Sequence, residues 1–326
     1  MYRLKNTNMK PSLTRLFIIC LGVLFCTLDI SAQNYRLEAG LRLGGANYLG
    51  DIGGKFLPRR DFVADIKLKA TGASAGAYLR YALTPGINVN LSYQWGRIGG
   101  ADSLSTNPGR NARNLSFTND IMEIGTVLEF EFYENYNVGR NRQYRVDFTS
   151  FVFAGIGYFT HNPKTEVDEE INGQTFKGVV ELAPLQTEGV AYELSGMALN
   201  LGIGMYWTVD RNIRIGARLG VRTTSTDYLD DVSTVYKDPR TFPETPQGQL
   251  GAAISNRTDE LEGQQVFNPT AGSVRGNPDY DDSYVFATLD IGYVFRGKGG
   301  KFKRNFHNGY RRSGGKRTKT SRFFSF

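Results

Sequence analysis

The feature that most constrains this chain is a strict alternation of apolar and polar residues, repeated in stretches of about ten residues. In a β-strand, successive side chains lie on opposite faces, so each stretch predicts a strand with one apolar and one polar face. Strands of soluble proteins usually end after five or six residues, whereas strands that cross a lipid bilayer need about ten. In the clearest stretch, the apolar face holds Ile87, Val89, Leu91, Tyr93 and Trp95, and the polar face holds Asn88, Asn90, Ser92, Gln94 and Gly96.

Eight stretches of this kind follow one another, and one of them, 148–159, is apolar on both faces. The predicted strands are 35–44, 73–83, 87–96, 122–132, 148–159, 197–207, 213–222 and 285–295. Short or moderate connections (84–86, 133–147 and 209–212) alternate with long ones; the long ones are 45–72, 97–114, 160–196 and 223–283.

The alternation of short and long connections indicates which kind of β-protein this is. Outer-membrane barrels have short periplasmic turns and long extracellular loops. A soluble sandwich or a lipocalin-type barrel, the alternative, has no reason to place every long loop at one end. We therefore predict an all-β fold, an antiparallel eight-stranded transmembrane β-barrel of OmpA-like size, over residues 33–295.

The polar faces of these strands carry many charged residues. An eight-stranded barrel is only wide enough for its own side chains, and buried charges have to be paired. We therefore predict an ion-pair network that plugs the lumen; charges lining a substrate path are the alternative, but an open channel needs more strands. The predicted network consists of Arg36, Glu38, Arg42, Arg80, Glu123, Glu129, Arg214, Arg218, Arg222 and Asp290.

The first residues have the pattern of a secretory signal peptide. A basic start is followed by the apolar run Leu16–Leu28 and by Ala32, a small residue before a polar one. The alternative, a membrane anchor, is disfavoured because the run is shorter than the roughly 20 residues that a spanning helix needs. We predict cleavage of residues 1–32, export through the inner membrane, and location in the outer membrane of a Gram-negative cell, in contact with its lipids.

Cysteine and histidine usage argues against a catalytic or cofactor site. Cys20 and Cys26 both lie in the predicted signal peptide, so the mature chain has no cysteine for disulfides, metals or catalysis. Of the two histidines, His307 lies in the C-terminal segment, and His161 follows Thr160 at a strand end, where we expect a surface residue rather than a base. We predict a protein that is not an enzyme and has no cofactor and no small-molecule substrate.

The C-terminal segment 296–326 contains eleven Lys and Arg residues and no acid. An even number of strands places both termini in the periplasm, where nucleic acid is absent, so we expect this tail to meet an acidic protein surface or anionic lipids. A tail that only solvates the terminus is the alternative. The predicted partner-binding residues are Lys298, Lys301, Lys303, Arg304, Arg311, Arg312, Lys316 and Arg317.

Three acidic stretches stand out in the long connections: 168–170, 230–231 and 279–282. None has the spacing of a calcium-binding loop. We expect these carboxylates to form solvated surface.

Several longer motifs resemble the PorG-like family of Bacteroidetes outer-membrane proteins, over about residues 35–295. These motifs are Asn47–Gly54, Arg113–Phe117, Phe153–Gly157 with Asn162–Lys164, Pro184–Gly189 and Thr226–Ser233. The most specific part includes Asp227, Tyr228, Leu229, Asp230 and Asp231, which we expect either to pack the outer mouth or to bind something outside.

The resemblance implies a non-enzymatic role in the type IX secretion system and gliding. Members of this family attach a periplasmic ring, made of a lipoprotein and a partner protein, to the outer membrane. The chain is therefore expected to bind periplasmic ring proteins. The alternative is an adhesin or receptor that works through its long loops and has no part in secretion.

Overall fold

The computed structural model describes residues 37–53, 70–105, 107–138, 144–171, 173–209, 212–261, 269–295 and 319–323. All of them belong to one compact unit, Tyr35–Phe295 with Gly309–Phe326. Among the described residues, no helix is both long and apolar enough to span a membrane. The predicted signal peptide, 1–32, lies outside the described residues.

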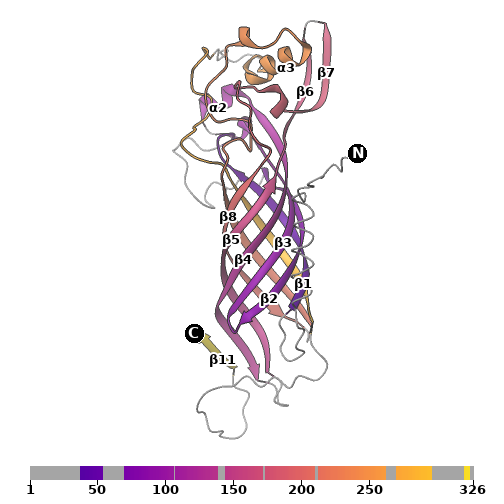
Figure 1. Cartoon of the computed structure of the whole chain (residues 1–326), viewed down its shortest axis with the longest axis vertical. Helices are drawn as coiled ribbons and strands as arrows, with labels where there is room; N and C mark the ends of the chain where they lie inside the picture. Colours follow the sequence, from indigo (N-terminus) through magenta and orange to yellow (C-terminus); the bar gives the residue numbers. More distant parts are fainter. Residues whose placement is uncertain are drawn as a thin grey trace, which may run out of the picture. The chain divides into compact units, whose positions relative to one another are not determined.

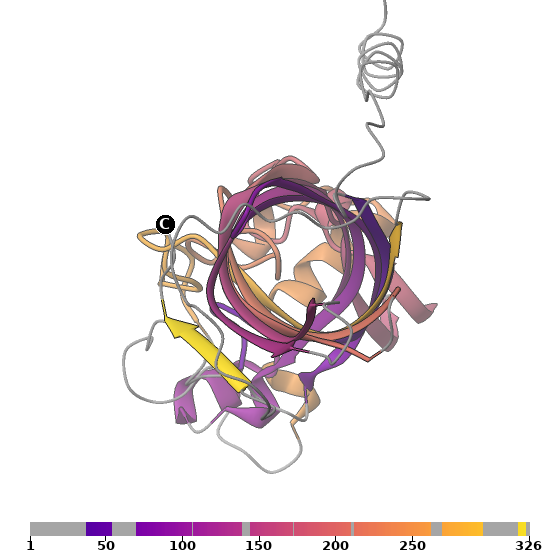
Figure 2. The same ribbon diagram turned by 90° about the horizontal axis from the view of Figure 1, so that it is seen from below.

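Eight antiparallel strands close into a barrel, which Figure 2 shows end-on as a ring. Each strand pairs with the next along the ring, and β1 pairs with β10 to close it. The strands are β1 (Leu37–Leu49), β2 (Gly72–Thr84), β3 (Ile87–Ala101), β4 (Ser116–Val138), β5 (Tyr144–Thr160), β8 (Ser195–Thr208), β9 (Ile213–Thr224) and β10 (Ser283–Phe295). The predicted fold class is confirmed, and each predicted strand is present.

The alternation sets the direction of each side chain, as predicted. Leu41, Leu43 and Leu289 are 59%, 64% and 67% exposed on the outer wall, whereas Arg42 between the first two is 3% exposed. Apolar side chains left in contact with the surroundings over a whole barrel wall are typical of a lipid-facing surface.

The long connections contain structure that the alternation did not reveal (Figure 1). Between β5 and β8 lies a hairpin, β6 (Pro163–Ile171) with β7 (Gln174–Glu181), which extends past one end of the barrel. The connections at this end also contain short helical segments. These are η3 (Asp102–Leu104), α2 (Pro108–Arg113), η4 (Ala183–Leu185), η5 (Pro239–Thr241), α3 (Pro246–Ser255) and η6 (Thr258–Glu260).

We call this end of the molecule the cap, defined as the described residues of connections 50–71, 102–115, 161–194 and 225–282. At the opposite end, β4 and β5 run on beyond the turn between β2 and β3, and a short strand, β11 (Lys319–Phe323), pairs with β4. The moderate connection predicted over 133–147 is therefore mostly strand.

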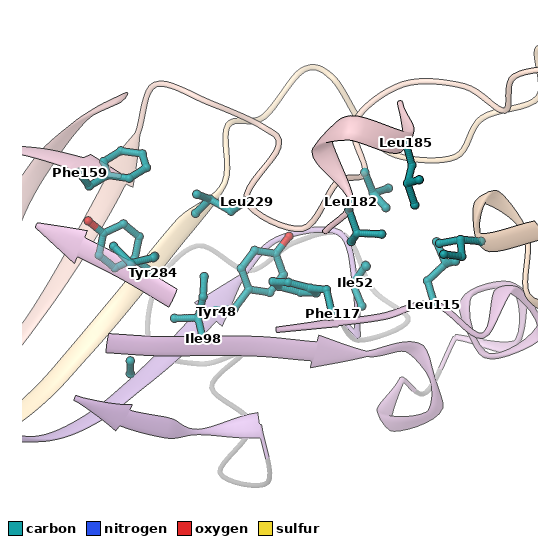
Figure 3. Packing of buried hydrophobic residues seen from close by; sticks show 14 of the residues in the cluster. Tyr48, Ile52, Ile98, Leu115, Phe117, Phe159, Leu182, Leu185, Leu229 and Tyr284 are labelled. Atoms are coloured by element: carbon teal, nitrogen blue, oxygen red, sulfur yellow. The ribbon is translucent and has the colours of Figure 1, made fainter. Parts of the chain in front are cut away.

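The largest buried apolar cluster lies at the cap end, where strand ends and connections meet (Figure 3). Tyr48, Phe117 and Phe159 from strand ends pack there with Leu229 and Leu185 from the connections. A second, smaller cluster lies in the lumen and consists of Val127, Phe151, Phe153 and Tyr206.

Glycines opposite aromatic residues make room inside the barrel. Phe151 is paired with Gly204, and Phe153 with Gly202, across β5 and β8. A Cβ atom on Gly204 would lie only 2.3 Å from the Phe151 ring. Rings therefore lie over glycines on the neighbouring strand, a pairing that fills a narrow barrel without crowding.

Candidate functional site

The lumen residues form an ion-pair network in which several partners face each other directly across neighbouring strands. Glu38 is paired with Arg80 between β1 and β2, and Arg42 with Asp290 between β1 and β10. Their side chains meet: Arg80 lies 3.1 Å from Glu38, and Arg42 lies 3.3 Å from Asp290. Arg214 reaches Glu38 from β9 at 2.7 Å.

Glu129 connects the two sides of the lumen. It pairs with Arg80 at 2.7 Å and also with Arg218, which lies 3.6 Å from Asp290. Glu129 is fully buried. Glu38, Glu129 and Asp290 each pair with two arginines, so removal of one of these carboxylates leaves two arginines unbalanced.

A further group surrounds Glu123 near the cap. Arg222 lies 3.3 Å away, and the carboxylate accepts hydrogen bonds from Asn200 at 2.9 Å and from the Tyr284 hydroxyl at 2.7 Å. Among the residues predicted for the network, nine come together in this way, and Arg36 lies outside the described residues.

The arginines of the lumen also stack on aromatic rings. The guanidinium of Arg218 lies 4.5 Å from the centre of the Phe153 ring, and that of Arg222 lies 4.6 Å from the centre of the Phe286 ring. Such cation–π contacts fill the space between the ion pairs. The described barrel interior holds five arginines and five carboxylates: Arg42, Arg80, Arg214, Arg218, Arg222, Glu38, Glu123, Glu129, Glu131 and Asp290.

The motif Thr226–Ser233 packs the mouth of the barrel. Leu229, Asp230 and Val232 are at most 1% exposed, and Asp231 is 2% exposed. Of the two predicted roles, packing is therefore the one its buried side chains perform. The prediction of solvated surface is wrong for Asp230, Asp231 and Asp282, because loops from other strands cover them; Asp168 is exposed, as predicted.

Tyr48 joins two of these carboxyl groups. Its hydroxyl oxygen lies 2.6 Å from Asp230 and 2.7 Å from Asp282, and it also accepts a hydrogen bond from the backbone N–H of Asp51. A phenol has one proton and can donate to only one carboxylate. The second short contact therefore requires a proton on one of the two carboxyl groups.

Burial favours the neutral form of this acidic cluster. Desolvation, followed by the nearby charge of Asp51, raises the pKa of Asp230 to about 7. Burial likewise raises the pKa of Asp227 to about 8, and burial with neighbouring Asp230 raises the pKa of Asp282. Within the described residues, no group of His, Cys, Asp or Glu side chains is arranged to hold a metal ion.

The motif Pro184–Gly189 forms hydrogen bonds with the motif Thr226–Ser233 and the residue that follows it. Glu188 accepts hydrogen bonds from the backbone N–H groups of Ser233 and Thr234 at 3.1 and 2.9 Å, and it pairs with Arg275 at 2.9 Å. The hydroxyl of Thr187 donates to Asp231 at 2.6 Å.

The motif Arg113–Phe117 ties the connection between β3 and β4 to the first motif. Arg113 pairs with Asp102 at 2.7 Å and donates to the backbone oxygen of Asp51 at 3.2 Å. The next residue, Asn114, has a φ of 56° and ends helix α2. Arg275 and Asp102 were not predicted, because no alternation or spacing marks a lone charge in a long loop.

His161 is a structural residue of the cap rather than a surface residue, which corrects the prediction. It is 3% exposed, and its Nε2 donates to the backbone oxygen of Glu193 at 3.2 Å, while Asn119 donates to its Nδ1 at 3.3 Å. These two partners fit the neutral ring, and burial lowers the pKa of His161 to about 4. Asn119 also donates to the backbone oxygen of Leu229 at 2.7 Å.

Motifs that are far apart in the sequence thus meet in one cap. The predicted partner-binding residues of the tail, from Lys298 to Arg317, lie outside the described residues. Within the described residues, buried polar groups are concentrated in the cap and in the lumen network. The lumen network fills the barrel, and the cap covers one end of it.

A family model described as a domain of unknown function, DUF6089, matches residues 14–242. No curated protein matches the sequence.

Solved structures with similarity to the chain are outer-membrane proteins. Neisserial surface protein A shares 8% identity, with 79% of this chain and 97% of that chain covered and a TM-score of 0.37. The major outer membrane protein of Thermus thermophilus shares 12% identity, with 79% and 99% covered and a TM-score of 0.37. OprG of Pseudomonas aeruginosa shares 10% identity, with 82% and 100% covered and a TM-score of 0.35. The assignment of eight strands rests on the strand pairing described above.

Proposed function

The chain belongs to the family described as a domain of unknown function, DUF6089, and we propose that it is a structural, non-enzymatic barrel of the outer membrane that holds a periplasmic assembly. The observation that carries the proposal is a lumen filled by paired charges under a closed cap. A barrel built in this way offers no path for a solute, so its use lies in the surfaces at its ends. Its apolar outer wall supports a place among membrane lipids.

The end opposite the cap offers the attachment surface. Here β4 continues from Phe132 to Val138, a length of roughly 20 Å at about 3.3 Å per residue. The basic segment 296–326 also follows β10 at this end. With the cap outside the cell, both would lie in the periplasm.

We identify the assembly, within this proposal, as the periplasmic ring of the type IX secretion and gliding machinery. The support for this step is the resemblance of the five motifs to the PorG-like family of Bacteroidetes. Three of these motifs are in contact in the cap: the Tyr48 hydroxyl lies at hydrogen-bond distance from Asp230, and Glu188 accepts a hydrogen bond from the backbone N–H of Ser233. The expected partners are a periplasmic lipoprotein and its ring protein.

A loop-mediated adhesin or receptor is the second candidate, and one observation favours it. The hairpin of β6 and β7 extends past the barrel, and the side chain of Val179 on β7 is 69% exposed. A hairpin that extends past the barrel is accessible to a partner on that side of the molecule.

The test separates the two ends of the molecule. The full chain, a chain that ends at residue 295, and a chain whose hairpin 163–181 is replaced by a short linker are purified from native membranes in mild detergent. We expect mass spectrometry to find a periplasmic lipoprotein with the full chain and with the hairpin variant. Its loss from the chain that ends at residue 295 would assign the contact to the basic segment, and its retention there would assign the contact to the extension of β4. Recovery of the barrel alone in all three would contradict the ring proposal, and a surface partner lost only with the hairpin would establish the receptor.

A further inference from the structure

One edge of β4 separates from β3 where the barrel ends. β3 pairs with β4 from Ile87, opposite Phe130, and a last hydrogen bond joins the Glu131 N–H to the Gly86 oxygen at 2.8 Å. Beyond this point β4 keeps its pairing with β5 on one side, and β3 no longer covers the other side. The other side presents a row of backbone N–H and C=O groups, which is a template for another strand.

The sequence of this edge does not protect it from pairing. Exposed edges are usually blocked by proline or lysine, and Tyr133-Glu134-Asn135-Tyr136-Asn137 contains neither. An edge that continues past the barrel without proline or lysine can pair with an added strand.

The chain places its own C-terminal strand on this edge. β11 pairs antiparallel with β4 over five successive positions without a register shift, from Lys319 opposite Asn137 to Phe323 opposite Tyr133. In this register Arg322 is directly opposite Glu134. β11 carries Lys319 and Arg322, so the new edge that it creates is protected.

β11 has the properties of a replaceable strand. It is five residues long, and within the described part of the chain its one partner strand is β4. Two strands paired over so short a length are marginally stable by themselves. The residues 296–318 connect β11 to β10, so β11 keeps an effective concentration near the edge of β4 after it detaches. A strand from another protein competes with β11 at this effective concentration.

We propose that the edge Tyr133–Asn137 of β4 is a strand-addition site, covered by β11 in the free barrel and taken over by an extended basic segment of a periplasmic protein. The incoming segment adds antiparallel to β4 and places a basic residue opposite Glu134. The periplasmic source of the segment rests on the proposed function; the strand exchange itself does not.

The pairing is tested first within one chain. Cys20 and Cys26 are replaced by alanine, and Asn135→Cys is combined with Ser321→Cys, since these positions are directly opposite. We expect a disulfide to form under mild oxidation. The matched control joins Asn137→Cys with Ser321→Cys, two positions out of register, where the distance exceeds disulfide reach. Equal cross-linking of the two pairs would overturn the register.

Exchange is tested with a peptide of residues 317–323 that carries Ser321→Cys as an activated mixed disulfide. It should label Asn135→Cys in a chain ending at residue 318 at least about ten-fold faster than in the full-length chain, where β11 competes. Labelling of Thr84→Cys, an exposed position at the turn after β2, should be unaffected by the truncation. The peptide with Lys319→Pro and Thr320→Pro should label slowly, because one of the two prolines removes a ladder hydrogen bond. Equal rates in the two chains would overturn the proposal.

Binding of the periplasmic partner is tested by purification from native membranes. The barrel used is the one in which the Asn135→Cys/Ser321→Cys disulfide keeps β11 on β4. We expect the locked Asn135→Cys/Ser321→Cys chain to lose the periplasmic partner and the reduced chain to recover it. Retention by the locked chain overturns the strand-addition site and leaves the proposed function standing. Absence of the partner from both forms counts against the proposed function, and the labelling rates then decide strand exchange independently.

Discussion

At the scale of single residues, the chemistry of the cap depends on the hydroxyl group of Tyr48. This oxygen holds Asp230 and Asp282 at hydrogen-bond distance, and both carboxyl groups are buried. Without it, Asp282 would lose the hydroxyl partner of its Oδ1 atom, whereas Asp230 would keep the backbone N–H groups of Ile52 and Val232. A buried oxygen that loses its partner is costly.

We therefore expect Tyr48→Phe to lower the free energy of unfolding by about 1–3 kcal/mol. Urea unfolding from lipid vesicles would measure it. Tyr93→Phe is the matched control, because Tyr93 is 49% exposed on the outer wall and should change stability little. Equal losses for the two variants would mean that the hydroxyl of Tyr48 has no special role.

The same cluster predicts a dependence on pH. The folded cap raises the pKa of Asp230 to about 7 and that of Asp227 to about 8, from an ordinary value of 3.8. Folding therefore binds protons, and this contribution to stability is complete below pH 4 and is lost as pH rises towards 8. Asp51 and Asp282 add to the effect, whereas Arg113 opposes it for Asp230.

We expect cleavage within 225–282 by a protease, corrected for the pH dependence of the protease itself, to be several-fold faster at pH 8.5 than at pH 5. Asp230→Asn should flatten this dependence because the amide cannot ionise. A cap that is cleaved equally at both pH values, or a variant with an unchanged dependence, would show that the carboxyl groups do not control it.

At the scale of elements, β5 and β8 fit together because glycine faces an aromatic ring. We expect Gly204→Ala to lower the free energy of unfolding by about 1–3 kcal/mol, since the new methyl group would overlap the Phe151 ring. Combining it with Phe151→Leu should restore part of the loss. If the two losses simply add, the overlap with Phe151 is not the cause.

The strands were predictable because alternation is a local property, whereas the cap elements were not. Residues 163–181 form a two-stranded hairpin outside the lipid-facing wall, and exposed charged residues such as Asp168 and Lys177 hide its alternation. Likewise β11 depends on an edge created by strands far away in the sequence, so its five residues carry no signal of their own.

At the scale of the whole molecule, the barrel is closed twice, by the charge network and by the cap. We expect the purified protein to show no steady porin-like conductance in planar lipid bilayers. Replacing 225–282 by a short linker should leave it non-conducting, because Arg80, Glu129 and Arg218 still fill the lumen. Steady currents after removal of the cap would mean that the lumen network does not block the path.

The sequence by itself determined the number of barrel strands, the lipid-facing side of each and the charges that point inwards. The alternation of side chains along a strand can be recognised from neighbouring residues alone. Charged side chains on the buried face must be paired. Only the tertiary structure decided which charges meet, that His161 is buried, and that acids predicted as solvated surface close the mouth of the barrel. Those outcomes depend on contacts between residues that are far apart in the sequence. Tyr48 and Asp282, for example, meet only when β1 and β10 close the ring.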